Sequence, residues 1–304
     1  MKINYLKHNA IDFNAWDECI SSSVNPRIYA TSSYLNIVSP GWDALITDDY
    51  RCVMPLTHKK KFGVSYIFHP PLTQQLGIFS IEFTNTETTK KCIEAIPRKF
   101  RLVDMPMNTA MPMDQSLYSE QGITHHLSLQ PGYTELHSGY SENTCRNIAR
   151  AVKNQLHVTQ SSDFGVISYM INAGCQPWVG GLGKETIKDV EKKLLQLLIN
   201  GIGSLFTVLD SNNEVFAAAV FSQYRGYITY LFGISSDTGK DKRAMFLAFD
   251  TIIHTNSGSN IILDFEGSSI EGIARFFRGF GATPVYFPKL KINNLPAAMR
   301  YFKK

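Results

Sequence analysis

Two carboxylates stand on either side of a phenylalanine near the C-terminal end of the chain, in the run Asp264-Phe265-Glu266-Gly267. Apolar residues precede them and a glycine follows, which predicts a strand over 261–266 that ends in a tight turn. Residues two apart on a strand share a face, and ligands bind at the carboxyl ends of strands in open α/β sheets. Glu266, nearest the strand end, is therefore a candidate general base, and the deeper Asp264 a candidate for orienting a partner. The alternative is that both carboxylates fix the turn by accepting backbone N–H bonds.

A helix is expected directly after this turn, over residues 269–280, with a serine available as its cap. Its apolar stripe at helical spacing consists of Ile270, Ile273, Phe277 and Phe280. Glu271, Arg275 and Arg278 fall on another face. The two arginines either pair with Glu271 or bind a phosphate, and pairing is the simpler interpretation.

Between Asp264 and Ala282 the chain reads Asp-Phe-Glu-Gly and then Arg-Phe-Phe-Arg-Gly-Phe-Gly-Ala. These runs resemble the C-terminal motif of the Fem-type peptidoglycan-bridge aminoacyl transferases and of their GNAT-like acyltransferase relatives. At the level of residue identity, the resemblance covers this stretch and, more weakly, a predicted basic helix that runs to Lys153. It implies an enzyme that transfers an acyl or aminoacyl group to an amine.

The order of the predicted elements extends the resemblance to the whole chain. Both halves read strand, helix, helix, three-stranded meander, helix and strand, with a terminal element closing each. The meander strands are expected at 42–47, 52–57 and 64–69, and again at 205–209, 215–223 and 227–233. This is the element order of the GNAT fold, and the Fem-type family uses two copies in tandem.

We therefore predict a mixed α/β (α+β) protein with two tandem GNAT-like domains, each a mostly antiparallel twisted sheet flanked by helices. The first domain is expected at 1–135 and the second at 156–304, with a basic linker helix in 136–155. In a GNAT-like sheet the acyl group lies where the fourth and fifth strands splay apart. Those strands are 227–233 and 261–266 here, which adds Tyr230 to the catalytic candidates. A buried core tyrosine with a hydrated hydroxyl is the alternative.

Several basic side chains are candidates for binding a phosphate. On the predicted basic helix these are Arg146, Arg150 and Lys153, which a solvated helix face explains equally. The loop after strand 227–233 offers Lys240, Lys242 and Arg243. It keeps one glycine of the loop with which CoA-using GNAT enzymes hold a pyrophosphate, and the spacing differs. The equivalent loop of the first half holds His69, Gln74 and Gln75, which either line a pocket or form a surface loop.

Composition sets limits on the partners and the compartment. The net charge of +4 permits an anionic ligand without requiring one, and the densest basic run, His58-Lys59-Lys60-Lys61, is interpreted as a solvated hairpin tip. Five scattered cysteines and the lack of a signal-like start indicate reduced thiols in a cytoplasmic protein without a membrane span. Adjacent His125 and His126 face opposite sides of a strand, so no metal site is predicted.

The leading hypothesis is an acyltransferase that forms an amide on an amine of a cell-wall precursor or similar acceptor. The resemblance implies acyl-CoA or aminoacyl-tRNA as the acyl donor, a small-molecule or nucleotide-linked acceptor, and tRNA, but not DNA, as a candidate partner. Two alternatives stay open. One is an acyl-CoA-dependent N-acetyltransferase, and the other is a non-enzymatic double-GNAT scaffold that binds its ligand without turnover.

Overall fold

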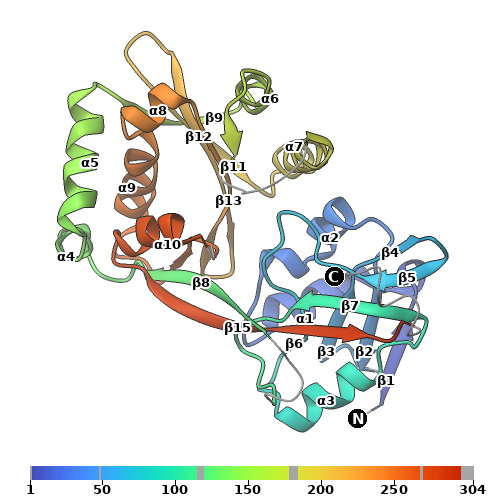
Figure 1. Ribbon diagram of the computed structural model, residues 1–304. Coiled ribbons are helices and arrows are strands. Elements are labelled where there is room, and N and C mark those ends of the chain that lie inside the picture. Colours follow the sequence, from blue (N-terminus) through green and yellow to red (C-terminus); the bar gives the residue numbers. More distant parts are fainter. Residues whose placement is uncertain (1, 48, 115–119, 178–183, 268–269, 296–304) are drawn as a thin grey trace. The chain divides into compact units, whose positions relative to one another are not determined.

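The computed structural model describes residues 2–47, 49–114, 120–177, 184–267 and 270–295 (Figure 1). Its residues form two units: residues 1–122 together with 286–304, and residues 123–285. Two strands carry the chain between the units. β8 (Glu120–Ser128) begins in the first unit, and β15 (Thr283–Asn293) begins in the second and ends in the first.

The first unit contains a sheet in the order β1-β2-β3-β6 and a second set of paired strands in the order β4-β5-β7-β15. Its other strands are β1 (Ile3–Leu6), β2 (Asp43–Thr47), β3 (Cys52–Leu56), β4 (His58–Lys61), β5 (Val64–Ile67), β6 (Phe79–Ser80) and β7 (Phe100–Pro106). Its helices are α1 (Phe13–Ser22), α2 (Ser32–Val38) and α3 (Thr86–Glu94), with short 3₁₀ turns at His8–Ala10 and Ile28–Ala30. Every residue of β2 and β3 is buried, so these strands form the centre of the unit.

The predicted three-stranded meander of the first half is wrong in its third strand. β2 and β3 pair antiparallel as expected, but β5 belongs to the other set of strands and runs parallel to β7. The basic run interpreted as a hairpin tip between the second and third strands, His58–Lys61, is the separate strand β4, which forms a tight hairpin with β5. Alternation of apolar residues marks a strand but does not say which sheet it joins.

The second unit is built on strands in the order β8-β14-β13-β12-β11-β9, with β10 also pairing with β13. Their bounds are β9 (His157–Ser161), β10 (Gln176–Pro177), β11 (Ser204–Leu209), β12 (Val215–Tyr224), β13 (Tyr227–Ser235) and β14 (Ile262–Asp264). β11, β12 and β13 form the predicted antiparallel meander. Among the strand pairs that the structure describes in this unit, β13 with β14 is parallel and the others are antiparallel.

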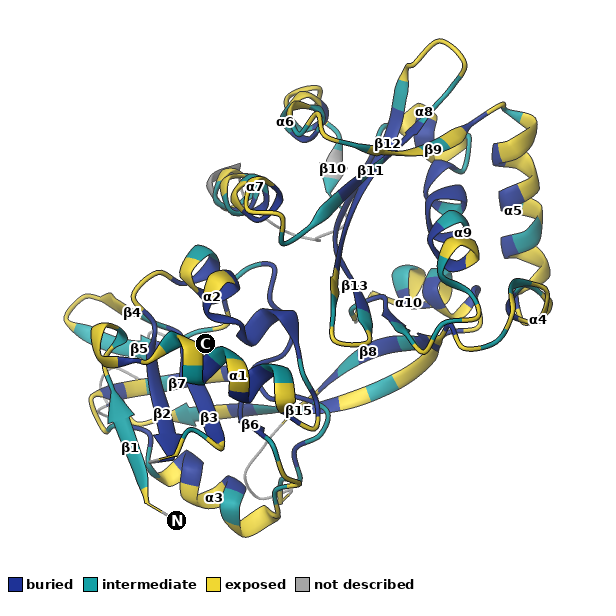
Figure 2. Ribbon diagram, turned by 180° about the vertical axis from the view of Figure 1, so that it is seen from behind, coloured by how far each residue is buried: buried dark blue, intermediate teal, exposed yellow. Residues whose placement is uncertain are grey.

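Helices cover both faces of this sheet (Figures 1 and 2). α5, α9 and α10 lie on one face, and α6 and α7 lie on the other. The helices of the unit are α4 (Tyr133–Ser138), α5 (Glu142–Lys153), α6 (Gly165–Asn172), α7 (Lys184–Ile199), α8 (Asp237–Asp241), α9 (Ala244–Asn256) and α10 (Glu271–Arg278). The expected basic helix is α5, and Ser141 caps it through a bond from the Thr144 N–H. None of the described helices combines the length and hydropathy needed to cross a lipid bilayer.

Aromatic residues of the C-terminal motif fill the core beneath α9 and α10. The Phe265 ring stacks on the Phe249 ring of α9, with centroids 5.1 Å apart and planes at 12°. Phe277 packs against Phe265, and Phe280 is fully buried beside both. Phe265, Phe277 and Phe280 are therefore core residues of the motif.

Candidate active site

The two strands expected to splay, β13 and β14, pair over only a few residues in the part of the chain that the structure describes. β13 and β14 pair in parallel from Tyr227 with Ile262 to Thr229 with Asp264. β14 ends there, whereas β13 continues to Ser235. β10 rejoins the same edge of β13 at Ile234, so no described strand pairs with residues 230–233 on that side.

A β-bulge lies at the start of this unpaired stretch. Val220 of β12 is opposite Phe232 and Phe221 is opposite Tyr230, so Leu231 is the extra residue of β13. A bulge bends its strand, increases the local twist and re-aims backbone groups, and such bulges are common beside active sites. The bulge thus lies directly after the last residue of β13 that pairs with β14.

Asp264 is fully buried at the end of β14 and is bound on several sides. Its Oδ1 accepts bonds from the Thr124 hydroxyl at 2.5 Å and from the Glu266 backbone N–H at 2.9 Å. Its Oδ2 lies 3.2 Å from Nε2 of His126 on β8. These contacts join β14 to β8 and fix the turn, which matches the expectation that this carboxylate orients its neighbours.

The expectation that Asp264 and Glu266 share a strand face is wrong. The strand stops at Asp264, and Glu266 has a left-handed φ of +58°. The Asp264 side chain accepts the N–H two residues ahead, which is an Asx-type turn, and this contact ends the strand before Gly267. Glu266 is half-buried beyond the strand end, next to the parting of β13 and β14.

Tyr230 lies in the core just after the last pair between β13 and β14. Its ring contacts the rings of Phe221 and Phe249, and its buried hydroxyl has no hydrogen-bond partner among the described residues. A Cβ at Gly233 would lie 1.8 Å from that hydroxyl, so the glycine makes room for it. Burial raises the pKa of Tyr230, and the charge of nearby Glu266 raises that pKa further. The hydroxyl therefore keeps its proton at neutral pH and can only donate it.

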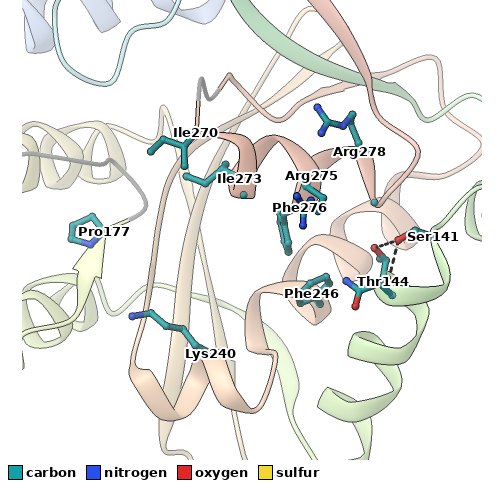
Figure 3. A pocket seen from close by; sticks show the side chains of 13 residues that line it. Ser141, Thr144, Pro177, Lys240, Phe246, Ile270, Ile273, Arg275, Phe276 and Arg278 are labelled. Carbon is teal, nitrogen blue, oxygen red and sulfur yellow. Dashed lines mark hydrogen bonds between the residues drawn. The ribbon is translucent and has the colours of Figure 1, made fainter.

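A cavity of about 970 Å³ opens between the helices that follow β13 and β14 (Figure 3). It is lined by Ser141, Asn143, Thr144, Pro177, Lys240, Phe246, Ile270, Gly272, Ile273, Arg275, Phe276, Arg278 and Gly279. Its wall is apolar where the rings of Phe246 and Phe276 meet edge to face, with centroids 4.7 Å apart. The capped N-terminal turn of α5 closes another side. This space has the size and mixed character typical of a small-molecule or cofactor site.

Three cations line this cavity. Arg278 forms an ion pair with Glu271 at 2.5 Å, and Lys240 pairs with Asp237 at 2.9 Å; both pairs are solvent-exposed. Arg275 is exposed, and no described carboxylate forms an ion pair with it. Exposed pairs stabilise little, so a phosphate can compete for these side chains. The simpler interpretation, pairing with Glu271, holds for Arg278 and not for Arg275.

The other basic candidates lie outside the cavity. The exposed side chains of Arg146, Arg150 and Lys153 follow the outer face of α5 and do not line it. The Lys242 ammonium sits 3.8 Å from the centre of the Phe216 ring, and the Arg243 guanidinium donates to the Lys240 carbonyl at 3.2 Å. Of the three residues in that loop, Lys240 alone lines the cavity.

The candidates of the first half belong to the first unit and bond within its own loops. The Gln75 side chain is fully buried, donates to Gln74 at 2.9 Å and accepts from the Thr109 N–H at 3.1 Å. The His69 imidazole Nε2 bonds the carbonyl of Thr73. These contacts explain the residues as loop supports, and none of the described cavities includes them.

Sequence reasoning missed several residues of the site. Phe246 and Phe276 were not among the candidates, and neither Thr124 nor His126 could be linked to Asp264, because that residue lies far along the chain. Ser141 was recognised only as a helix cap. A site assembled from α5, α8, α9 and α10 becomes visible only once these helices are packed together.

Comparison with solved structures establishes the class of fold. FemX superposes with a TM-score of 0.70 at 12% identity over 99% of both chains. L-PGS from Bacillus licheniformis gives 0.56 at 10% identity over 96% of this chain and 94% of its own. A conserved protein of unknown function from Bacteroides thetaiotaomicron superposes with a TM-score of 0.58 at 9% identity, over 92% of this chain and 97% of its own. No family model and no curated protein matches the sequence. The likeness shows the fold, and the predicted class, a mostly antiparallel GNAT-like fold of the Fem type, is confirmed.

Proposed function

We propose that the second unit is an acyltransferase that forms an amide by moving an acyl or aminoacyl group onto an amine. The observation that carries this proposal is the position of the cavity. It opens between the helices that follow β13 and β14, the two strands that part beside Tyr230 and Glu266. In a GNAT-like fold this is the place of the acyl donor, and the likeness to FemX supports the same assignment. Such support by fold is associational, so the geometry of the site has to bear the argument.

The residues next to the point where β13 and β14 stop pairing suit the steps of amide formation. The amine attacks the carbonyl carbon, the new C–N bond forms, and Glu266 accepts the amine proton. Backbone N–H groups at the bulge around Leu231 stabilise the oxyanion, which is usually the largest contribution to catalysis. The bond from the carbonyl carbon to the donor oxygen or sulfur then breaks, and the Tyr230 hydroxyl gives its proton to that atom. Glu266 returns a proton to Tyr230 and completes the cycle.

The donor that fits the cavity carries a phosphate. Arg275 and Arg278 supply positive charge from α10 and Lys240 supplies it from α8, and Phe246 and Phe276 between them supply a ring surface on which an apolar group or a base can lie. Acyl-CoA and aminoacyl-tRNA both match this chemistry. The position of Gly239 argues against CoA as the donor. This glycine packs against the Phe216 carbonyl, so its backbone is not free to approach a pyrophosphate. The acceptor that the Fem-type resemblance implies is an amine of a cell-wall precursor.

Direct binding measurements test the proposal. Acetyl-CoA and a charged tRNA are titrated separately into the whole protein across a range of salt concentrations. We expect one of them to bind, and the double variant R275Q/R278Q to weaken that binding at least tenfold, about 0.7 kcal/mol per arginine. The matched control is R150Q/K153Q, which removes two exposed cations from α5 outside the cavity. If neither probe binds, or if the control variant loses as much affinity, the cavity is not the donor site and the non-enzymatic scaffold becomes the better account.

A further inference from the structure

The hairpin of β4 and β5 has an unusual residue at its turn. Lys59 pairs with Tyr66 and Lys61 with Val64, so Phe62 and Gly63 form a two-residue loop. Both have left-handed backbone conformations, with φ of +49° and +78°. Turns of this kind favour Asn-Gly or Asp-Gly, and a bulky residue at positive φ is a genuine outlier. Phe62 therefore occupies a position where a polar residue would fold more easily.

The phenyl ring of Phe62 projects into solvent, because the residue is 90% exposed. Three exposed lysines precede it directly, Lys59, Lys60 and Lys61 (Figure 2). In the part of the chain that the structure describes, none of the three pairs with a carboxylate. Instead, the Lys61 ammonium lies 5.5 Å from the Phe62 ring centre and that of Lys59 4.4 Å from the Phe68 ring centre.

Folding explains only half of this arrangement. β4 is the outermost strand of its set, and lysines on an edge strand discourage pairing with other chains. That accounts for the lysines. It does not account for an aromatic side chain that buries nothing and adopts a disfavoured backbone conformation. A strained, exposed residue of this kind points to a contact with a partner.

We propose that the tip of this hairpin, residues 59–63, docks on the surface of an anionic lipid bilayer. Phe62 enters the boundary between headgroups and acyl chains, and the lysines meet the anionic headgroups while their aliphatic stems lie along the interface. A projecting tip with one aromatic apex suits a soft planar surface. Single-stranded nucleic acids instead occupy basic grooves with several aromatic rings for successive bases, and this hairpin offers no such groove.

The two parts of the tip contribute separately to binding. Each lysine near an anionic leaflet strengthens binding by about fivefold, the equivalent of about 1 kcal/mol. Insertion of the phenyl ring adds about tenfold or more. Neither is sufficient for stable attachment, so we expect reversible binding that weakens with salt.

Co-sedimentation of the full chain with vesicles tests the proposal. We expect binding to vesicles of equal parts phosphatidylcholine and phosphatidylglycerol, and little binding to phosphatidylcholine alone. F62S is expected to weaken binding about tenfold and K59Q/K60Q/K61Q about a hundredfold. All three lysines and the phenylalanine are exposed, so these variants should fold, and circular dichroism checks that they do.

Two control variants replace the same types of exposed residue, a phenylalanine and a pair of lysines, at positions outside the hairpin tip. Phe83 is 87% exposed in the same unit but follows Glu82, so F83S should leave vesicle binding unchanged. Lys90 and Lys91 form ion pairs with Glu94 and Glu87 on α3, so K90Q/K91Q should also have little effect. The proposal fails if vesicles are not bound, if F62S binds as well as the native chain, or if a single-stranded RNA is bound through the same lysines while anionic vesicles are not.

Discussion

Asp264 and Glu266 have different environments although one residue separates them. Asp264 is fully buried and accepts bonds from Thr124 and from the backbone of Glu266. Glu266 is half-buried past the strand end and influences the pKa of Tyr230. The first carboxylate therefore holds the turn, and the second is the one left for proton transfer. Substitutions at the two positions should separate stability from activity.

Asp264→Ala is expected to lower the free energy of unfolding by about 3 kcal/mol. The substitution leaves the Thr124 hydroxyl and the Glu266 N–H without their acceptor in a buried place, which costs about 1–3 kcal/mol for each group. Urea denaturation followed by circular dichroism measures the change. Asp264→Asn keeps an acceptor oxygen and should lose less; equal loss in both variants would contradict the hydrogen-bond explanation.

Glu266→Gln is expected to slow acyl transfer by about 10²–10⁴-fold, the usual contribution of a general base. The amide keeps the size of the side chain, so donor affinity and the urea midpoint should remain those of the native protein. Transfer rates are measured with whichever donor the binding experiment identifies. A variant that turns over at the native rate would remove Glu266 from the mechanism and leave it a role in the turn.

His125 makes stability depend on pH. It is fully buried beside Phe277, and neither ring nitrogen has a hydrogen-bond partner within the described residues. Burial lowers its pKa below the ordinary value of 6.5, and the positive charge of Arg278 lowers it further. As the pH falls through 6.5, the imidazole of His125 takes up a proton in the unfolded chain before it does so in the folded one. The contribution of His125 to the free energy of unfolding is therefore present above that pH and is lost below it.

The variant His125→Phe should lose this part of the pH dependence. The free energy of unfolding is measured by urea denaturation at about pH 7.5 and about pH 5.5, and the native protein should lose more between the two than the variant. His157→Gln, an exposed change on β9, serves as the control and should behave like the native chain. A variant with the native pH profile would show that other groups cause the loss.

At the scale of elements, glycines distinguish α8 from α10. Gly239 of α8 packs so tightly on β12 that an added Cβ would lie 2.1 Å from the Phe216 carbonyl oxygen. Gly272 of α10 has no atom within 4 Å of that position. The first glycine is required by the close approach of α8 to the sheet. The second is not required by packing.

Gly239→Ala is therefore expected to destabilise the protein by about 1–3 kcal/mol through overpacking against backbone. Gly272→Ala should stabilise it by up to about 1 kcal/mol, because alanine favours a helix over glycine. Thermal unfolding of the two variants, each compared with the native chain, gives the sign of both changes. Equal effects would mean that the approach of α8 to β12 is not as close as described.

The helices were easier to predict than the strand partners. The basic helix predicted in 136–155 exists as α5 (Glu142–Lys153) with Ser141 as its cap, because a cap and a helical stripe are local features. β14 proved shorter than predicted, since the Asp264 side chain ends it from within. The pairing of β5 with β7 and the bulge at Leu231 depend on residues far apart in sequence, and no local pattern encodes them.

At the scale of the whole molecule, the last strand belongs with the first part of the chain. The terminal element predicted to close the second half exists as the strand β15, which pairs antiparallel with β7 from Lys289 to Asn293. Residues 286–304 accordingly group with residues 1–122. The sequence shows an amphipathic strand there but contains no local sign of the distant strand that receives it.

A chain that ends at residue 285 should lose stability in the first unit and keep it in the second. The truncation leaves one edge of β7 without its partner and removes the buried side chains of Phe287 and Leu290, each of which contributes about 1.5–3 kcal/mol. Hydrogen exchange read peptide by peptide should show faster exchange in β5 and β7 and native protection in β11–β13. Unchanged protection throughout would show that β15 is dispensable.

The place of β15 also determines the order in which the protein can mature during its synthesis. Residues leave the ribosome from the N-terminus at about 5–20 per second. The continuous stretch 123–285 is therefore translated in full before the first unit receives all of β15, which pairs with β7 from Lys289 to Asn293. During that interval the edge of β7 is open to other chains, so slow translation of residues 286–293 would expose an aggregation-prone nascent protein to chaperones.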